Sequence, residues 1–174
     1  MNIKAVDFDE IVADTIQQFQ IFLQNTDSSL YVHRLTDNNY KELANRDFPL
    51  NWAYIISDKS TFDGGFDFGL TWQEKKQLVG AFIAAYKPID RSLEIYAIER
   101  LDKSILNGKM MRYSLYICYL LSSLIDCTSV KAIDVEEGNQ ELRNFYKSLG
   151  FQELNEQDFI LSITDLIALF NTGG

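Results

Sequence analysis

A phenol, two carboxylates and a small group of basic side chains are the residues of this sequence that could do chemistry. Tyr146 lies near the end of an expected helix that follows an expected strand, where ligands of parallel α/β sheets bind. Glu94 and Glu99 lie on another expected strand. The basic group is Lys103, Lys109 and Arg112. In an acidic chain such a group favours an anion site, with a few solvated cations beside a helix as the alternative.

The stretch "GNQELRNFYKSLGF" (138–151) contains signals for both ends of a helix. Asn139 can cap the helix by accepting from a free amide of the first turn. Gly150 can take the left-handed conformation that ends it, and Phe151 then folds back onto the last turn. Leu142, Phe145 and Leu149 are predicted to form its apolar stripe. Tyr146 is not needed for any of this, so it is either a core tyrosine or a functional one.

The composition predicts one folded α/β domain spanning 1–174, with 47% apolar residues. A net charge of −9 argues against nucleic acid and anionic membranes as partners and fits a cationic partner, or simply solubility. "MNIKAVDFDE" lacks the apolar core of a signal peptide, and "SLYICYLLSSLI" (114–125) is too short to span a bilayer. Cys118 and Cys127 read as reduced thiols, which predicts a cytoplasmic protein. His33, the sole histidine, is predicted to lie in a surface loop.

The first third of the chain predicts a strand at 2–8, an amphipathic helix from Asp9 to about Gln24, and a loop. A short helix follows, capped around Thr36 or Asp37. Residues 47–65 are ambiguous between strand and helical turn.

The remaining elements alternate more clearly. Three meander strands are expected, then a helix, a strand, a helix and a closing antiparallel pair. Their ranges are 66–72, 77–86, 92–100, 110–124, 130–135, 140–149 and, for the closing pair, "FQEL" with "DFILSITDL". The order strand–helix–strand predicts that 92–100 and 130–135 are parallel.

"AIDVEEGNQELRNFYKSLGF" (132–151) resembles the motif that runs from the fifth strand through the fourth helix of the GNAT superfamily of N-acetyltransferases. The order of the other elements is similar to that family along nearly the whole chain. The resemblance implies a mixed sheet of six to seven strands, in which parallel strands four and five splay apart, with about four flanking helices.

The resemblance also implies acetyl-CoA as cosubstrate, without a metal. The pantetheine arm would lie between the splayed strands, where unpaired backbone groups can bind it, and the pyrophosphate would lie at the next helix N-terminus. The implied cofactor contacts are Ile98, Gly108, Lys109, Met110, Met111, Arg112, Tyr113, Asn139 and Tyr146.

The phosphate loop departs from the family pattern. That pattern is Gln/Arg-x-x-Gly-x-Gly/Ala, whereas the corresponding segment here is "LNGKMMRYS" (106–114). The glycine positions fall on Met110 and Arg112, and shifting the alignment recovers no glycine. Gly108 alone remains nearby. Either the loop binds phosphate through its amides with Lys109 and Arg112, or the cofactor site is lost.

In that family acetyl is transferred directly to a primary amine. Tyr146 resembles the general acid that protonates the CoA sulfur, and Glu94 resembles a general base found in some members. Strand alternation puts Glu94 and Glu99 on opposite faces, so Glu99 competes as the base, and an exposed carboxylate is the alternative for both. A backbone amide near Ile98 or Glu99 is the implied oxyanion donor.

Other functions stay open at this point. A GNAT-like domain that no longer catalyses would bind a ligand or a protein instead. "AVDFDEIVADT" (5–15) resembles the nucleophile motif of haloacid dehalogenase-type phosphatases, with Asp7 as nucleophile, Asp9 as acid/base and Mg²⁺ bound by carboxylates. The acceptor amine is expected to be a cationic small molecule or a protein lysine or N-terminus, in a pocket shaped by residues 26–65. A homodimer is compatible with the closing strands.

Overall fold

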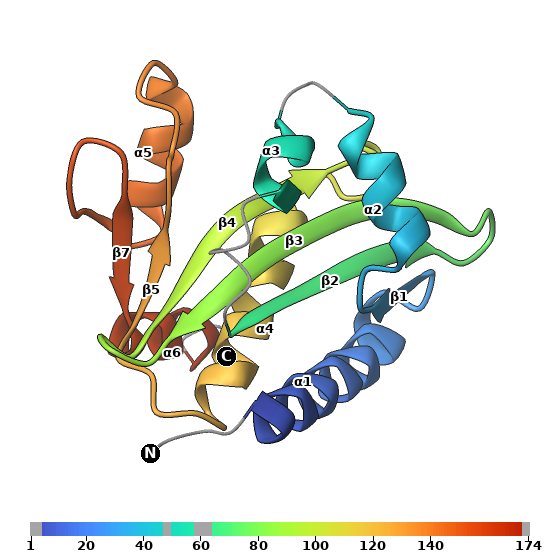
Figure 1. Ribbon diagram of the computed structural model, residues 1–174, viewed down its shortest axis with the longest axis horizontal. Helices are drawn as coiled ribbons and strands as arrows, with labels where there is room; N and C mark the ends of the chain where they lie inside the picture. The colour runs from blue at the N-terminus through green and yellow to red at the C-terminus, as the bar shows by residue number, and fades with distance from the viewer. Residues whose placement is uncertain (1–4, 47–49, 58–63, 172–174) are drawn as a thin grey trace.

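The computed structural model describes residues 5–46, 50–57 and 64–171, which form a mixed sheet with helices on both faces (Figure 1). The sheet has seven strands in the order β1-β2-β3-β4-β5-β7-β6, and β4 and β5 are its parallel neighbours. The strands are β1 Leu30–His33, β2 Gly65–Trp72, β3 Gln77–Lys87, β4 Ser92–Arg100, β5 Ser129–Ala132, β6 Gln152–Glu153 and β7 Phe159–Ser162. This is the sheet expected of the GNAT fold.

Six helices are described, two more than expected. They are α1 Ala5–Thr26, α2 Asp37–Ala44, α3 Trp52–Ser57, α4 Met110–Ser122, α5 Gln140–Ser148 and α6 Ile163–Asn171. The large hydrophobic core joins α1, α4, α5 and α6 to one face of the sheet. A smaller core joins α2 and α3 to the other face. We call α2 and α3 the cap, and the face beneath them the cap face.

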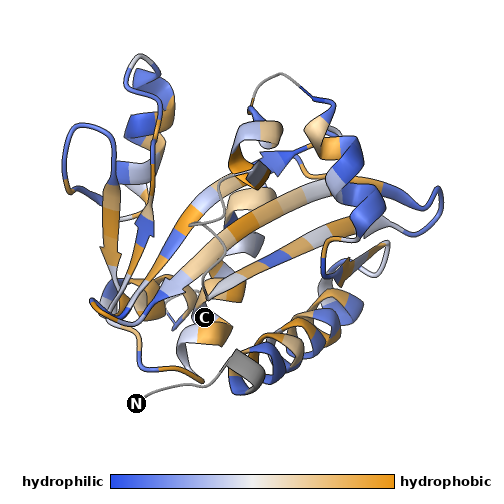
Figure 2. Cartoon of the chain, in the orientation of Figure 1, coloured by the Kyte–Doolittle hydropathy of each residue, from blue (hydrophilic) through white to orange (hydrophobic). Residues whose placement is uncertain are grey.

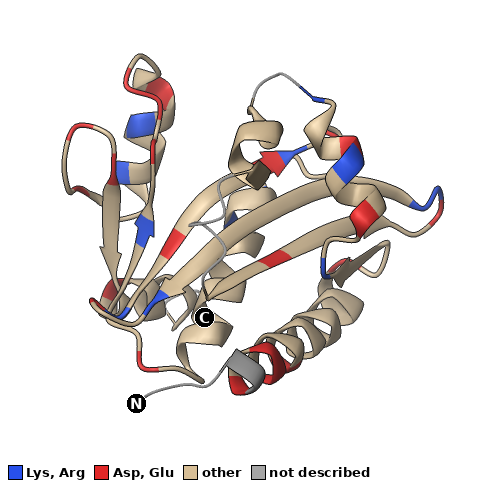
Figure 3. Cartoon of the chain, viewed as in Figure 1, with Lys and Arg blue, Asp and Glu red and all other residues tan. Residues whose placement is uncertain are grey.

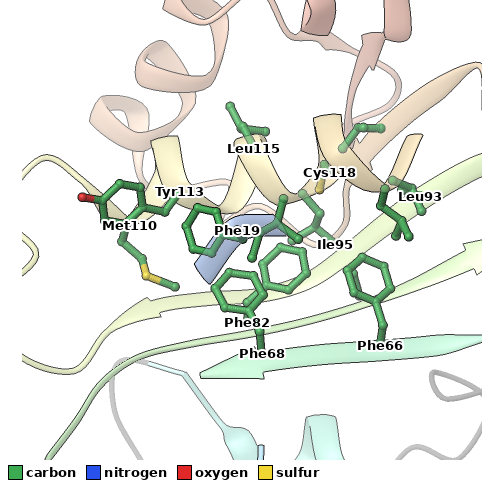
Figure 4. Packing of buried hydrophobic residues seen from close by; sticks show 14 of the residues in the cluster. Phe19, Phe66, Phe68, Phe82, Leu93, Ile95, Met110, Tyr113, Leu115 and Cys118 are labelled. Carbon is green, nitrogen blue, oxygen red and sulfur yellow. The ribbon is translucent and has the colours of Figure 1, made fainter. Parts of the chain in front are cut away.

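The large core is built from aromatic rings between the sheet and helix α4 (Figure 4). Phe68 of β2 stacks on Phe82 of β3 with ring centroids 4.7 Å apart, and Phe19 of α1 packs edge-on against Tyr113 of α4 at 5.7 Å. The hydropathy of the chain follows this arrangement, because β3 and α4 are apolar along most of their length (Figure 2). Such close packing makes this part of the sheet and helix α4 rigid.

Several predicted elements are confirmed, most of all the β2–β3–β4 meander. Helix α2 begins in a capping box, in which the Thr36 hydroxyl accepts from the Asn39 amide at 3.1 Å and the Asn39 side chain accepts from the Thr36 amide. The closing pair is antiparallel, as expected.

The N-terminal prediction was wrong. Residues 5–8 belong to α1, so the predicted strand 2–8 is not formed over its described part, and residues 2–4 lie outside the described residues. Asp7 and Asp9 are exposed on this helix and do not follow a strand. The phosphatase arrangement is therefore absent. A 22-residue helix that packs on α4 through Phe19 and Phe22 overrides the short alternation of its first residues.

Three further elements differ from the prediction. Strand β1 lies in the segment read as a loop, and its His33 is paired on both ring nitrogens, with Arg34 O and Thr71 Oγ1 at 2.7 Å each. The ambiguous segment contains helix α3. The last strand ends at Ser162, whose hydroxyl accepts from the Asp165 amide at 3.1 Å and so starts helix α6.

A β-bulge on β4 lies at the point where β4 and β5 stop pairing. Ile83 of β3 faces Ala97, but the next residue, Ala84, faces Ile95, so Tyr96 is an extra residue on β4. Pairing between β4 and β5 ends at the hydrogen bond from the Ile133 amide to the Ile95 carbonyl, 3.0 Å. Beyond Ile95 the two strands diverge (Figure 1), which confirms the expected splay.

Candidate functional site: the opening between two parallel strands

The opening between β4 and β5 has two arms. One arm is the second half of β4, followed by the loop 101–109 and the first turn of α4. The other arm is β5 with helix α5. On the β4 arm, backbone groups of residues 97–99 that point away from β3 have no strand partner among the described residues. Such groups can bind the amides of a substrate.

The loop 101–109 consists of two turns. The Asp102 carboxylate accepts from the amides of Ser104 and Ile105 at 3.0 and 3.1 Å, which closes the first turn. The Lys109 amide donates to the Leu106 carbonyl at 3.0 Å, and Gly108 has φ 71°. That geometry is typical of a type II turn with glycine in its third position.

The first turn of α4 offers several free backbone donors. The amides of Gly108, Met110, Met111 and Arg112 have no hydrogen-bond acceptor within the described part of the chain, and Tyr113 is the first to donate, to Lys109 O at 2.9 Å. The N-cap residue Lys109 supplies no side-chain cap, and this turn contains no acidic residue. A helix start with free amides and an unopposed dipole favours an anion.

The basic side chains of this arm have different surroundings. Lys109 Nζ pairs with Asp27 Oδ2 at 3.1 Å, and the Tyr113 hydroxyl donates to the same oxygen at 3.3 Å. Burial and Asp27 raise the pKa of Tyr113 to about 12. Arg112 and Lys103 are exposed and have no partner among the described residues. Of the three predicted cations, Lys109 is thus already neutralised, and Tyr113 offers neither its amide nor its hydroxyl to a cofactor.

The bulge at Tyr96 changes the predicted faces of β4. Leu93 and Ile95 face the large core, whereas Tyr96 and Ala97 both pack on the cap side. Alternation on the two sides of the bulge therefore places Glu94 and Glu99 on the same face, the cap face, and the prediction of opposite faces was wrong.

Glu94 is half-buried and lies one residue before the end of the β4–β5 pairing. Its Oε2 accepts from the Tyr96 hydroxyl at 2.6 Å. Its neighbour across the parallel register, Lys131, pairs instead with Asp90 at 2.6 Å. Glu94 therefore keeps a carboxylate oxygen at the opening that no basic side chain of the described residues neutralises.

Glu99 lies deeper, beneath the cap, and only 5% of it is exposed. Its Oε2 is 3.3 Å from the Arg46 guanidinium, and the Trp52 side chain and the Leu50 backbone also lie against the carboxylate. Among the described residues, however, neither carboxylate oxygen has a hydrogen bond of good geometry, and Arg46 Nε and Trp52 Nε1 have none either. Burial raises the pKa of Glu99 although Arg46 opposes this. Buried polar groups with poorly aligned hydrogen bonds lower stability, and the Arg46 guanidinium offsets part of this cost at Glu99.

Asp67 of β2 is the second buried acid of the cap face. It accepts from the Leu35 amide at 2.7 Å, from the Tyr40 hydroxyl at 2.6 Å and from Arg34 Nε at 3.3 Å. Burial and then Asp67 raise the pKa of the Tyr40 phenol, which therefore stays protonated. Asp67 fastens the chain between β1 and α2 to the sheet.

Helix α5 on the other arm begins and ends as predicted. Asn139 Oδ1 accepts from the Leu142 amide at 3.0 Å, Gly150 has φ 101°, and Phe151 is buried with its ring 5.2 Å from that of Tyr146. The predicted apolar stripe was wrong at Phe145, which is 44% exposed.

Tyr146 and Arg143 form the buried face of α5 in place of Phe145. The Tyr146 ring stacks on Phe159 of β7 at 5.6 Å. Burial raises the pKa of Tyr146 to about 12, and its hydroxyl has no hydrogen-bond partner among the described residues. The phenol is therefore protonated at neutral pH and available as a proton donor.

Sequence reasoning missed Tyr96, Arg46 and Trp52. The bulge that turns Tyr96 toward Glu94 leaves no mark on the alternation of "SLEIYAIER". Arg46 and Trp52 reach Glu99 only through the fold of the cap. Arg46 ends the stretch predicted as a short helix and Trp52 lies in the ambiguous segment 47–65, so neither pattern indicated that the two would meet Glu99.

The described residues were also compared with other kinds of site. No group of three or more His, Cys, Asp or Glu side chains within residues 5–46, 50–57 and 64–171 could hold a metal ion. None of the helices described is long and apolar enough to cross a membrane. A cavity of 520 Å³ lies at the far end of β5 and β7, around Asp90 and Lys131, and contains none of the predicted site residues. The geometry therefore favours the opening.

Comparison with known proteins supports the fold. No protein-family model and no curated protein matches the chain. Among solved structures, the chain is similar to mutant forms of the spermidine/spermine N-acetyltransferase SpeG from Vibrio cholerae, with TM-score 0.58 and 14% identity over 83% of this chain and 99% of that one. It is also similar to AtaTR bound with AcCoA, with TM-score 0.59 and 16% identity over 82% and 99%. FdhC, a nucleotide-linked sugar GNAT, aligns with TM-score 0.62 and 11% identity over 83% and 92%. The chain has the GNAT fold.

Proposed function

We propose that this protein is an acetyl-CoA-dependent N-acetyltransferase whose acceptor is a primary amine. The observation that carries the proposal is the opening itself: β4 and β5 separate after Ile95, and the arm that begins there leads to four free amides at the start of α4. One solved neighbour with this fold is an N-acetyltransferase, and another is bound with AcCoA, which supports the proposal.

The residues present fit acetyl-CoA in two places. The pyrophosphate is to be held by the amides of Met110, Met111 and Arg112, with the exposed Arg112 guanidinium as the nearest unpaired cation. The pantetheine amides are to bind the open edge of β4 near Ile98, whose amide region is also the candidate oxyanion donor. Asn139 is occupied as a helix cap and is assigned no cofactor contact.

The chemistry requires a base for the amine and an acid for the departing sulfur. Glu94 takes the proton that a cationic amine must lose, and passes it to water. The neutral nitrogen then attacks the thioester carbonyl carbon, the C–S bond breaks, and an amide bond forms. Tyr146 gives its proton to the thiolate and is reprotonated by the proton that the nitrogen loses. The products are an N-acetyl amine and CoA.

Glu94 is preferred to Glu99 as the base. Glu94 is partly exposed beside the opening and has a single hydrogen bond from Tyr96. Glu99 is buried beneath the cap and faces Arg46, so an amine could reach it only if the cap moved. Glu99 is therefore assigned to the cap and not to the reaction.

A cationic acceptor fits the charge of the opening. The segment between β5 and α5 is acidic (Figure 3), with four carboxylates and no basic side chain in residues 134–141. Glu94 adds a carboxylate on the facing arm. One neighbour is named for spermidine and spermine, which are polycations, and this supports the same class of acceptor here.

A non-catalytic binding module is the second candidate. It is favoured by the loop 101–109, which lacks the family glycines and whose Lys109 is neutralised by Asp27. The first question is therefore whether the protein binds acetyl-CoA at all, because an acetyltransferase must bind it. A screen of amines is informative only once this binding is established.

The first test is calorimetric titration with acetyl-CoA and with CoA, without Mg²⁺. Saturable binding with a Kd on the order of 10 µM is expected. Absence of binding at millimolar cofactor would leave the binding module as the remaining function. Arg112→Glu should then raise the Kd about tenfold, because it places a like charge beside the pyrophosphate. Lys41→Glu, the same charge change on the exposed side of α2, is the matched control.

A further inference from the structure

Gly80 of β3 lies directly against the loop 101–109 and the start of α4. It is buried and faces Arg100 across the antiparallel register. A Cβ at this position would lie 2.7 Å from Leu106 Cδ1 and 2.7 Å from Met110 Sδ. Carbon atoms do not pack at such distances, so both side chains occupy the space that any other residue at 80 would fill.

Leu106 and Met110 fix the two ends of the turn that precedes α4. Leu106 is fully buried and its carbonyl accepts from the Lys109 amide; Met110 is 2% exposed and is the first residue of α4. Figure 4 shows the Met110 side chain pointing from the helix toward the strands. Gly108, between them, has no atom near its Cβ position. The buried contacts of the turn are thus those of its two apolar ends, and the Arg100–Asn107 and Lys109–Asp27 contacts beside them are exposed.

The start of the loop is fastened to the same strand. The amides of Leu101 and Asp102 both donate to the Val79 carbonyl, at 2.7 and 3.2 Å. Val79 precedes Gly80, so the loop approaches β3 closely at two consecutive residues. The shape of the loop is thus imposed from the sheet.

We infer that Gly80 is a positioning residue of the cofactor's phosphate site: because it has no side chain, the turn before α4 can lie directly on β3, which sets the direction of the free amides at the start of α4. This inference rests on the proposed function. The Leu106 and Met110 side chains occupy the space next to Gly80. This packing fixes the orientation of the Met110, Met111 and Arg112 amides before the cofactor binds.

The test compares two equally crowded glycines of the same sheet. Gly80→Ala places a methyl group against the turn. Gly69→Ala, on β2, places one 2.8 Å from Leu78 Cδ1 and 3.0 Å from Leu35 Cδ2, at a site away from the loop. The unfolding midpoint and the Kd for CoA are measured for both variants and the wild type.

Gly80→Ala is expected to raise the Kd for CoA at least about tenfold, and Gly69→Ala less than about twofold, although both lower the unfolding midpoint. Hydrogen exchange without CoA supplies a second readout: the Lys109 amide should exchange faster in Gly80→Ala and not in Gly69→Ala. A folded Gly80→Ala that binds CoA as the wild type does would overturn the inference. Equal losses in both variants would overturn it as well, because they would reflect general destabilisation.

Met110→Gly tests the same idea in the opposite direction. It restores a family glycine to the loop, yet it removes one of the two anchors, so it should weaken CoA binding about tenfold. Tighter binding would contradict the role given to Gly80. If Gly80→Ala does not fold, Leu106→Ala replaces it, with Leu43→Ala, equally buried but beneath the cap, as its control. A wild type that does not bind CoA would overturn the proposed function and this inference together, whereas an unaffected Gly80→Ala overturns the inference alone.

Discussion

The two buried carboxylates beneath the cap, Asp67 and Glu99, share a face of the sheet but not an environment. Asp67 accepts hydrogen bonds from a backbone amide, a phenol and a guanidinium. Glu99 faces Arg46 and Trp52, and none of its contacts with the described residues is a well-formed hydrogen bond. A satisfied buried carboxylate holds a fold together, whereas an unsatisfied one costs stability and is retained for another reason or tolerated.

Glu94 extends the comparison to a third environment on the same face. It is partly exposed, has one hydrogen bond, and lies where the strands separate. The three carboxylates of this sheet face therefore have different roles. Asp67 attaches the chain between β1 and α2 to the sheet, Glu99 contacts the cap, and Glu94 is the proposed base. Each assignment predicts a different response to losing the charge.

The largest effect is expected at Asp67. Asp67→Ala leaves Arg34, Tyr40 and the Leu35 amide without their acceptor, which should lower the free energy of unfolding by about 3–5 kcal/mol. Denaturant titration measures this loss. Asp67→Asn keeps one acceptor and should recover part of it; a loss below about 1 kcal/mol for the alanine variant would contradict the fastening role.

The next effect concerns activity. Glu94→Gln should lower kcat about 100-fold, because the amine loses its base, and should change stability by no more than about 0.5 kcal/mol. Glu99→Gln is the matched variant on the same strand, with kcat near that of the wild type. If Glu99→Gln were the slower enzyme, the assignment of the two glutamates would be reversed.

Tyr146→Phe tests the contribution of the β5–α5 arm separately from that of the β4 arm. It should lower kcat about tenfold, since water in the opening can replace part of the proton donation, and it should leave the Kd for CoA unchanged. Single-turnover acetylation measures the chemical step directly. Equal rates for both proteins would remove Tyr146 from the mechanism and leave it as a core tyrosine stacked on Phe159.

The smallest effect is a dependence of stability on pH at Glu99. Its pKa in the folded protein is raised by burial, so the folded state binds this proton more tightly than the unfolded state does. The stabilisation is fully present below the unfolded pKa and is lost as pH rises through the folded one. The advantage of the wild type over Glu99→Gln should therefore shrink as pH rises from about pH 4. A difference independent of pH would show that burial and Arg46 cancel, and an advantage that grows as pH rises would show that Arg46 outweighs burial.

Local signals in the sequence predicted much of this molecule. The meander, helix α2 and helix α5 were predictable because each carries its own turn or cap, such as Thr36, Asn139 and Gly150. The splay followed from the family resemblance. Ser162 with Asp165 three residues later was a readable helix start that was taken for a continuing strand.

The remainder depends on contacts between distant residues. The bulge at Tyr96 is defined by pairing with β3, and it alone brings Glu94 and Glu99 to one face. Arg46 meets Glu99 only when the cap is packed, and Gly80 meets Leu106 only when the loop lies on the sheet. The periodicity of residues within a segment contains no information about these contacts between residues that are distant in the sequence.

The cap also contains a natural optical reporter. The chain has two tryptophans, of which Trp52 is fully buried beside Arg46 and Glu99, while Trp72 is partly exposed at the end of β2 beneath Lys75. An indole that is shielded from water emits at shorter wavelength than one in contact with water. In a Trp72→Phe variant, the fluorescence of Trp52 would therefore show whether the cap stays packed on the sheet when an acceptor binds. No added label is needed.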